Sequence, residues 1–211
     1  MTGLGFINNI DYAIGNSINN FLNYTNGFFS PILKFITYLG NGGAIFIVVA
    51  VILLLFNKTR KVGIIVLFSM LLGFIITNLL LKNIVARPRP YMDEKSNFYI
   101  WWKQAGSLME SGYSFPSGHT TSAMAFGFTL FLCFKKKLSW LFLFIPLIMG
   151  FTRIYFMVHF ASDVIVALLV GAVCCLISYF VMKYIEKLTF MQKILTYPSI
   201  TNVFKRKNKS E

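Results

Sequence analysis

Five long apolar stretches constrain this chain more than any other feature of its sequence. A helix needs about 20 mostly apolar residues to cross the hydrocarbon core of a bilayer. Such stretches occupy roughly residues 31–56, 62–81, 118–134, 138–157 and 161–182 of the 211 residues. Only 13% of the residues are charged, against about 25% in soluble domains. The sequence therefore predicts an all-α, polytopic membrane helix bundle with about five transmembrane helices.

The first 30 residues differ from these stretches because polar residues interrupt them throughout. Apolar side chains still recur there at helical spacing, at Phe6, Ile10, Ala13, Ile14, Ile18, Phe21 and Leu22. This pattern favours an amphipathic helix that lies on the membrane surface. A partly ordered terminus is the alternative, since Asn and Gly have low helix propensity. Neither reading includes a signal peptide, because a basic start and a continuous apolar run are both missing.

The basic residues are placed asymmetrically between the expected spans. Thirteen of the 20 Lys and Arg residues follow the first, third and fifth stretches, and seven lie elsewhere. Cytoplasmic loops are enriched in Lys and Arg, so we expect the N-terminus outside the cell membrane and the C-terminus inside. The net charge of +13 thus sets topology and does not indicate nucleic-acid binding. The expected single domain comprises an interfacial helix (1–30), a core (31–185) and a basic cytoplasmic tail (186–211). The tail either binds anionic lipid or is simply solvated.

The three cysteines, Cys133, Cys174 and Cys175, all fall inside expected spans. An odd number of cysteines within lipid-embedded segments does not form a disulfide framework. We interpret them as small apolar residues of the helix bundle.

A histidine and a carboxylate lie close together where the fifth stretch begins. Asp163 is an ionisable residue within a span, which is costly and indicates function. His159 lies four residues earlier, on the same helix face. A carboxylate bonded to one imidazole nitrogen fixes the tautomer and leaves the other nitrogen free to act as a nucleophile. The alternative is that the two side chains only satisfy each other between helices.

Cations and a helix start accompany this pair on the same outer side. Lys82, Arg89 and Arg153 suit a phosphate group, because Arg offers a planar fork of donors to its oxygens. Ser117 can cap the third stretch, and free amides at a helix N-terminus bind anions. Gly118 allows close approach to a ligand, and His119 follows in the first turn. Alone, this Pro-Ser-Gly segment is equally typical of an ordinary helix start.

Together these segments resemble the signature of the type 2 phosphatidic acid phosphatase superfamily. The signature joins Lys82 with Arg89-Pro90, then Pro116-Ser-Gly-His119, and then Arg153 with His159 and Asp163. The resemblance covers about residues 28–185. Three departures are visible: Thr152 stands where the family often has Ser, Arg87-Pro88 forms a second Arg-Pro, and family members commonly have six spans.

The resemblance implies a membrane lipid phosphatase that needs no metal or other cofactor. In that reading Lys82, Arg89, Ser117, Gly118 and Arg153 bind phosphate. His159 attacks phosphorus, Asp163 orients His159, and His119 moves protons to the leaving oxygen and from water. No metal-ligand cluster is evident in the sequence, and the Lys and Arg residues would take the place of a metal.

Several aspects of function stay open at this level. The candidate substrates are phosphatidylglycerophosphate, undecaprenyl diphosphate, phosphatidic acid and related lipids, bound at the extracytoplasmic face of the cell membrane. The runner-up is a lipid or sugar phosphotransferase of the same fold. A transporter or a non-catalytic membrane protein fits less well, because the polar motifs gather at one face and no repeat is present. No protein partner is indicated.

Overall fold

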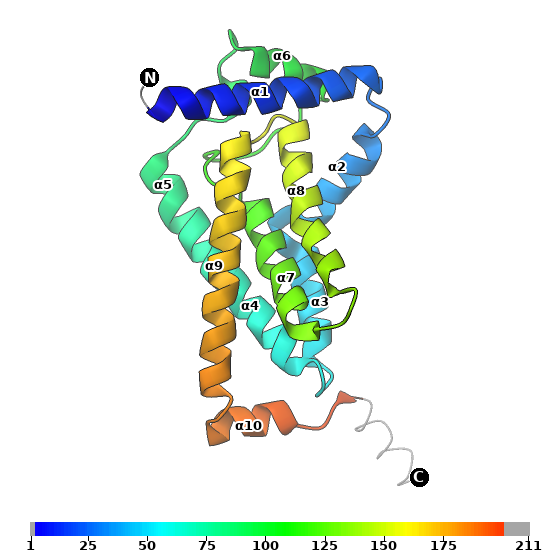
Figure 1. The fold of residues 1–211 in the computed structure, drawn as a ribbon, viewed down its shortest axis with the longest axis vertical. Coiled ribbons are helices and arrows are strands. Elements are labelled where there is room, and N and C mark those ends of the chain that lie inside the picture. Colours follow the sequence, from blue (N-terminus) through cyan, green and yellow to red (C-terminus); the bar gives the residue numbers. More distant parts are fainter. Residues whose placement is uncertain (1–2, 201–211) are drawn as a thin grey trace.

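Helices of one bundle run between two transverse helices in the computed structural model, which describes residues 3–200. Helix α1 (Gly3–Tyr24) lies across one end of the bundle, and α10 (Thr189–Thr196) lies across the other (Figure 1). The predicted N-terminal helix is therefore present, and no strand occurs within the described range. The helices of the bundle are α2 (Ser30–Leu39), α3 (Ala44–Leu54), α4 (Arg60–Phe74), α5 (Lys82–Val85), α7 (Gly118–Phe134), α8 (Phe144–Tyr155) and α9 (Ala161–Ile185).

Two segments are long and apolar enough to cross a membrane by themselves. They are α9 and the segment Arg60–Met92, in which a π-helical turn (Ile75–Leu81) joins α4 to α5. The pair α2 and α3 makes a third candidate if one bent unit counts as a span. Helix α7 has 17 residues, and Ser139–Tyr155 is likewise a shorter apolar segment. The membrane helix bundle is thus apparent, while the count of five spans stays a prediction.

The first predicted span is not one straight helix. A short 3₁₀ turn (Asn41–Gly43) separates α2 from α3, and the two parts are bent by 44°. Gly43 has φ +70°, a conformation that glycine adopts without the penalty of a side chain. A Cβ atom at Gly43 would also lie 2.7 Å from the Met70 methyl carbon. The glycines at this point therefore bend the span and bring its backbone close to α4.

Close approach of small residues holds the bundle helices together. A Cβ atom at Gly171 of α9 would lie 2.7 Å from the Thr121 carbonyl oxygen of α7, and one at Gly63 of α4 would lie 2.7 Å from the Ala50 carbonyl oxygen of α3. Such small residues let backbones pack directly in membrane proteins. Phe46 and Phe126 stack with ring centroids 4.9 Å apart and fill the core between α3 and α7.

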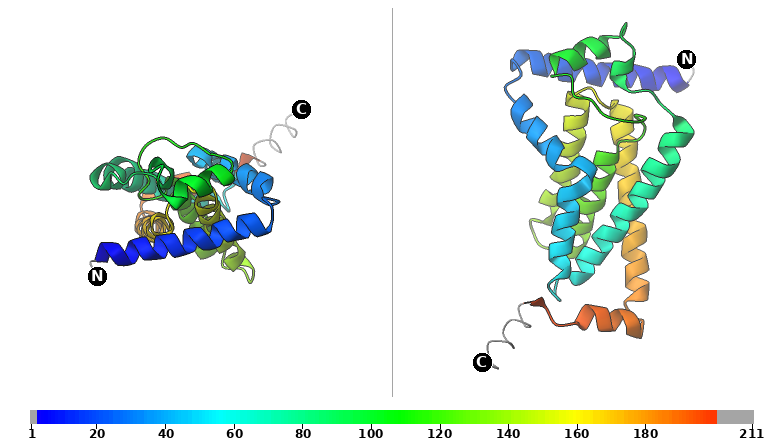
Figure 2. Two further views of the ribbon diagram at one scale, coloured as in Figure 1. Left: turned by 90° about the horizontal axis from the view of Figure 1, so that it is seen from above. Right: turned by 180° about the vertical axis from the view of Figure 1, so that it is seen from behind.

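Two helices outside the bundle were not predicted from the sequence. Helix α6 (Asn97–Gln104) forms within the long outer loop near α1 (Figure 2). Helix α10 begins the predicted basic tail and packs Met191 against Ile65 and Met182. Residues 201–211 of that tail lie outside the described range.

The two ends of the bundle differ in charge. The basic turn after α3, the Lys135–Lys137 segment after α7, and α10 all lie at the end opposite α1 (Figures 1 and 2). The segments that hold the candidate site residues lie at the α1 end. This arrangement agrees with the predicted orientation, which remains a prediction.

Candidate active site

A cavity of about 500 Å³ opens at the α1 end of the bundle, between α3, α4 and the start of α7. Five of the predicted site residues line it: Lys82, Arg89, Gly118, His119 and His159. They come from three separated parts of the sequence, as the motif analysis required. The remaining wall runs from polar to apolar and includes Asn78, Glu110, Ser122, Ile47, Leu67, Met70, Leu71 and Phe74.

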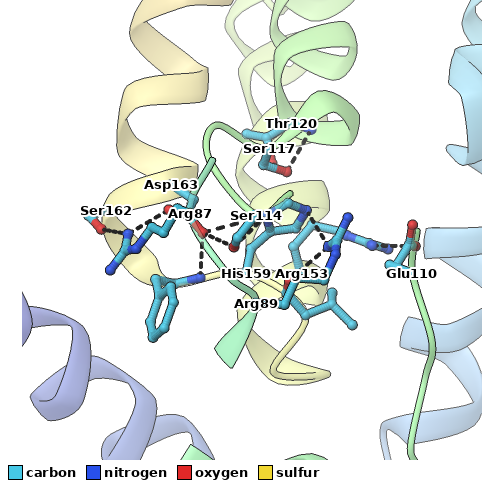
Figure 3. Close-up of polar contacts among 12 residues, drawn as sticks. Arg87, Arg89, Glu110, Ser114, Ser117, Thr120, Arg153, His159, Ser162 and Asp163 are labelled. Atoms are coloured by element: carbon cyan, nitrogen blue, oxygen red, sulfur yellow. Dashed lines mark hydrogen bonds and ion pairs between the residues drawn. The ribbon is translucent and has the colours of Figure 1, made fainter. Parts of the chain in front are cut away.

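His159 presents its Nε2 atom toward Arg89. The distance from Arg89 Nη1 to His159 Nε2 is 3.3 Å (Figure 3). A guanidinium group can only donate, so Nε2 acts as the acceptor. We therefore assign the proton of the neutral ring to Nδ1, which faces Ser114 and Asp163 at 3.5 and 3.6 Å. Nε2 is therefore unprotonated, and its lone pair can attack an electrophile once Arg89 releases it.

Burial keeps His159 neutral. Its side chain is 2% exposed, and desolvation lowers its pKa to about 4, partly opposed by the neighbouring Asp163 carboxylate. Burial disfavours the charged form of an imidazole because the surroundings cannot solvate it. The unprotonated ring is therefore the dominant form at neutral pH.

Asp163 lies directly behind His159, but the prediction that both lie on one helix face is wrong, because His159 precedes α9 and only Asp163 belongs to that helix. Its Oδ2 atom accepts from the Phe160 amide at 2.9 Å and from the Ser114 hydroxyl. Because Oδ2 is 3.6 Å from His159 Nδ1, their contact is longer than an ordinary hydrogen bond. Ser114, which sequence analysis did not select, contacts both side chains (Figure 3).

The start of α7 confirms the prediction that Ser117 caps this helix, but Ser117 is not among the residues that line the cavity. Ser117 is the N-cap of α7, and its hydroxyl accepts from the Thr120 amide at 3.4 Å. The same hydroxyl also accepts from the Thr120 hydroxyl at 3.0 Å. Gly118 does line the cavity, where an added Cβ would lie 3.0 Å from Asn78 Oδ1.

His119 and Asn78 bring unused polar atoms to the cavity. His119 Nε2 and Asn78 Oδ1 are buried and have no hydrogen-bond partner among the described residues. Buried polar atoms without partners are rare and costly. Their position on the wall of a cavity indicates that a bound molecule completes their hydrogen bonding.

Arg153 is buried beside this cavity and is held by Glu110 rather than facing open space. Its guanidinium donates to the Glu110 carboxylate (Figure 3) and to the Thr37 hydroxyl. Arg153 lines an adjoining hollow that shares Glu110 and Ser111 with the main cavity. Burial raises the pKa of Glu110, but the charge and hydrogen bond of Arg153, together with the charges of His119 and Arg89, hold the pKa below its usual value. Glu110 is therefore an anion at the position where a phosphate was expected.

The two Arg-Pro arginines have different surroundings. Arg89 lines the cavity and donates to the carbonyl oxygens of Gly112, Val158 and Ser111 at 2.7–2.9 Å. Arg87 turns away and binds Asp163 Oδ1 at 2.6 Å. This placement agrees with the choice of Arg89 as the phosphate ligand on spacing alone. Lys82 also lines the cavity and makes no ion pair within residues 3–200.

Four residues at or beside this site were not predicted from the sequence. Asn78 and Glu110 line the cavity, Ser114 binds Asp163, and Asp11 binds Arg87. None belongs to a motif segment, and each reaches the site only through the fold. The sequence pointed to Arg87 only indirectly, because Arg87-Pro88 forms a second Arg-Pro pair next to Arg89-Pro90. With Asp11 and Glu110 included, three carboxylates lie at or beside the candidate site, so the excess of cations there is smaller than the sequence indicated.

Comparison with known families matches residues 62–187 to the PAP2 superfamily. The match spans more than half of the chain and contains Lys82, Arg89, the Pro-Ser-Gly-His segment, Arg153, His159 and Asp163. The chain therefore belongs to the PAP2 superfamily.

Two characterised relatives share part of the sequence. A bacitracin transport permease protein, BcrC, of Bacillus licheniformis is 37% identical over 99 residues, which cover 46% of this chain and 47% of the relative. An undecaprenyl-diphosphatase of Sulfolobus acidocaldarius is 28% identical over 128 residues, covering 61% and 59%. The chain thus matches about half to three-fifths of the length of these relatives.

Two solved structures share the fold. LpxE of Aquifex aeolicus superposes with a TM-score of 0.64 at 26% identity, covering 80% of this chain and 94% of that one. A PAP2-type phosphatidylglycerolphosphate phosphatase of Bacillus subtilis gives 0.61 at 21% identity, covering 88% and 96%. The helical architecture is therefore that of a PAP2 membrane protein.

Proposed function

We propose that this protein is a membrane lipid phosphatase that hydrolyses lipid phosphates or diphosphates through a phosphohistidine at His159. The observation that carries the proposal is the position of buried His159, whose Nε2 atom lies 3.3 Å from Arg89 Nη1 and which lines a cavity together with Lys82 and Arg89. A neutral imidazole with its Nδ1 proton directed to a carboxylate is the arrangement expected of a histidine nucleophile.

The first step forms a bond from His159 Nε2 to phosphorus and breaks the bond from phosphorus to the leaving oxygen. His119, which enters this step as an imidazolium, donates a proton to that oxygen, so the lipid departs as an alcohol or as a lipid monophosphate. The imidazolium character that develops on His159 is balanced by Asp163. Lys82 and Arg89 stabilise the charge on the phosphoryl oxygens, and this is usually the largest catalytic term.

The second step returns the site to its starting state. Water loses a proton to His119 while its oxygen attacks phosphorus, and the nitrogen–phosphorus bond breaks. Inorganic phosphate leaves, and His159 is again neutral. In this scheme His119 acts first as an acid and then as a base, which suits its unpartnered Nε2 atom on the cavity wall.

Arg153 joins the site when substrate replaces Glu110. A phosphoryl group carries more negative charge than a carboxylate and offers more acceptor oxygens, so it competes well for the guanidinium. Arg153 Nε, which is buried without a partner among the described residues, gives a further donor. Glu110 thus neutralises Arg153 in the empty site and yields to substrate.

The apolar part of the cavity supports a lipid substrate. Below the polar groups the wall consists of Ile47 from α3 with Leu67, Leu71 and Phe74 from α4. The side chains of Ile47, Leu71 and Phe74 are also well exposed on the flank of the bundle, where a membrane protein meets hydrocarbon. A phosphate in the polar part can therefore remain attached to a chain in the bilayer. Undecaprenyl diphosphate, phosphatidylglycerophosphate and phosphatidic acid are the candidate substrates.

Phosphate release from a panel of these lipids, by purified protein in detergent with EDTA, tests the proposal. We expect release that persists in EDTA and disappears in His159→Ala. A folded wild-type protein that releases no phosphate from any lipid contradicts hydrolysis. Transfer of the phosphoryl group to an added lipid or sugar acceptor, without release of inorganic phosphate, favours the phosphotransferase. Release that requires added metal contradicts the metal-free scheme.

A further inference from the structure

A carboxylate of the N-terminal helix is buried against the bundle near the active site. Asp11 lies on α1 and is 2% exposed. Its Oδ1 atom accepts from the Ser162 amide at 2.7 Å, and its Oδ2 atom accepts from the Ser162 hydroxyl at 2.8 Å and from Arg87 Nη2 at 2.7 Å. Helix α1 precedes the segment matched by the family model. Asp11 therefore brings a charge to the site from outside the shared core.

Arg87 connects Asp11 to Asp163, the carboxylate behind His159. Its Nη1 atom donates to Asp163 Oδ1 at 2.6 Å and to the Ser162 hydroxyl at 2.7 Å. Its guanidinium also lies 3.9 Å from the centroid of the Phe160 ring. One guanidinium thus joins a carboxylate of α1 to the carboxylate behind His159 (Figure 3 shows Arg87 beside Asp163 and Ser162).

We propose that Asp11 is a positioning residue, which acts through Arg87 to hold Asp163 in the orientation that His159 needs. This role rests on the proposed phosphohistidine mechanism. Arg87 is shared between two carboxylates, so each of them faces only part of its charge. Without Asp11, Arg87 loses the partner that fixes its guanidinium between the two carboxylates. Asp163 is then held less firmly in the orientation that His159 needs during attack.

Asp11 also fixes the place where α9 begins. The Ser162 amide is one of the free donors in the first turn of α9, and Asp11 satisfies it from another helix. Asp163 is the next residue, so a shift of this turn moves its carboxylate directly. Both contacts of Asp11 therefore converge on the position of Asp163.

Separate measurement of kcat and KM distinguishes a positioning role of Asp11 from a role in substrate binding. Asp11 does not line the main cavity, so Asp11→Asn leaves KM within about twofold. We expect kcat to fall about 10-fold, the lower end of the loss seen when partners of a functional ligand are removed. Asp11→Glu restores the charge and recovers most of kcat. Arg87→Gln lowers kcat at least as much, and Asp11→Asn causes little further loss in that background.

A second α1 contact provides the matched control. The Asn97 side-chain amide donates to the Tyr12 hydroxyl at 2.9 Å, next to Asp11 in sequence but without contact to Arg87. Tyr12→Phe removes this contact between α1 and α6 and should retain wild-type kcat. If Asp11→Asn fails to fold, Arg87→Gln breaks the same connection and takes over the test.

Each outcome bears on one claim. Wild-type activity in Asp11→Asn, an equal loss of kcat in Tyr12→Phe, or a change confined to KM overturns the positioning role while the phosphatase stands. A wild-type protein that releases no phosphate, measured in the same assay beside His159→Ala, refutes the proposed function and the positioning role with it.

Discussion

Arg60 and Arg153 are buried at opposite ends of the bundle, and their hydrogen-bond partners differ in kind. At the α10 end, Arg60 donates to the carbonyl oxygens of Leu54, Ile194 and Tyr197 at 2.6–2.9 Å. At the α1 end, Arg153 is fully buried, is held by two side chains, and keeps its Nε atom without a partner in the part of the chain that the structure describes. Main-chain carbonyls cannot leave without unfolding the segment, whereas the Glu110 side chain can turn away.

The kind of partner alone does not separate a structural end from a functional end, because Arg89 at the α1 end also donates to main-chain carbonyl oxygens. Arg60 ties the chain after α10 to the start of α4. Within residues 3–200, the α1 end has buried polar atoms without partners on His119, Asn78 and Arg153. Such atoms cost stability, and a protein keeps them where a ligand supplies the missing bonds. Substitutions at the two ends should therefore affect different measurements.

The largest expected effect is that of His159→Ala at the α1 end. We expect phosphate release to fall by about 1,000-fold or more, as when a covalent nucleophile is removed, with little loss of thermal stability. His119→Ala should cause a loss of similar kind, because both proton transfers fail. Rates of phosphate release and thermal unfolding in detergent test both variants. A marked loss of thermal stability in both would contradict the separation of the two ends.

Arg60→Met should produce the opposite pattern at the α10 end. The change leaves several carbonyl oxygens without their donor, and we expect the free energy of unfolding to fall by about 2–4 kcal/mol. Activity per folded molecule should stay within about twofold of wild type. Lys61→Met is the control, because the Lys61 to Glu186 ion pair is partly exposed and such pairs contribute about 1 kcal/mol or less. Equal destabilisation by both variants would contradict a structural role specific to Arg60.

Glu110→Gln tests the exchangeable partner of Arg153. Glutamine keeps an acceptor for the guanidinium but not the charge, so substrate phosphate displaces it more easily. We expect KM to fall about fivefold, which corresponds to about 1 kcal/mol. Glu94→Gln makes the same charge change at an exposed position of the same loop and should leave KM unchanged. An unchanged or higher KM in Glu110→Gln would show that Glu110 does not compete with substrate.

The smallest effect expected is a shifted titration of one imidazole. Because desolvation lowers the pKa of His159 to about 4, its ring should stay neutral as the pH falls from 7 to 5. An ordinary histidine, with a pKa near 6.5, becomes protonated over this range. Nitrogen NMR of histidine-labelled protein can follow both rings, since the chain has two histidines and His119→Gln assigns them. A midpoint near 6.5 for His159 would contradict its desolvated environment.

Much of the functional end could be predicted because its motif residues have unusual chemistry for a membrane protein. The spacing of Lys82, Arg89, Gly118, His119 and His159 predicted one site, and the structure places these residues around one cavity. Apolar length likewise predicted helices in the right places. These inferences needed only local sequence and the cost of charge in a bilayer.

The remaining features depend on contacts between distant parts of the chain. The bend between α2 and α3 depends on glycines in a stretch that composition alone reads as continuous. Glu110 and Asp11 look like ordinary loop and surface acids until the fold brings them to Arg153 and Arg87. Helix α10 lies in the segment that was interpreted as a tail because of its basic residues. Local patterns do not reveal which tertiary partner a polar residue will meet.

The most direct test of the account is to trap the phosphoenzyme. A lipid phosphate with a radiolabelled terminal phosphoryl group is mixed with the protein in EDTA and quenched during turnover. We predict a covalent label that is stable in alkali, labile in acid, and absent from His159→Ala. Turnover by wild type without any such label, or a label that persists in His159→Ala, would contradict attack by His159.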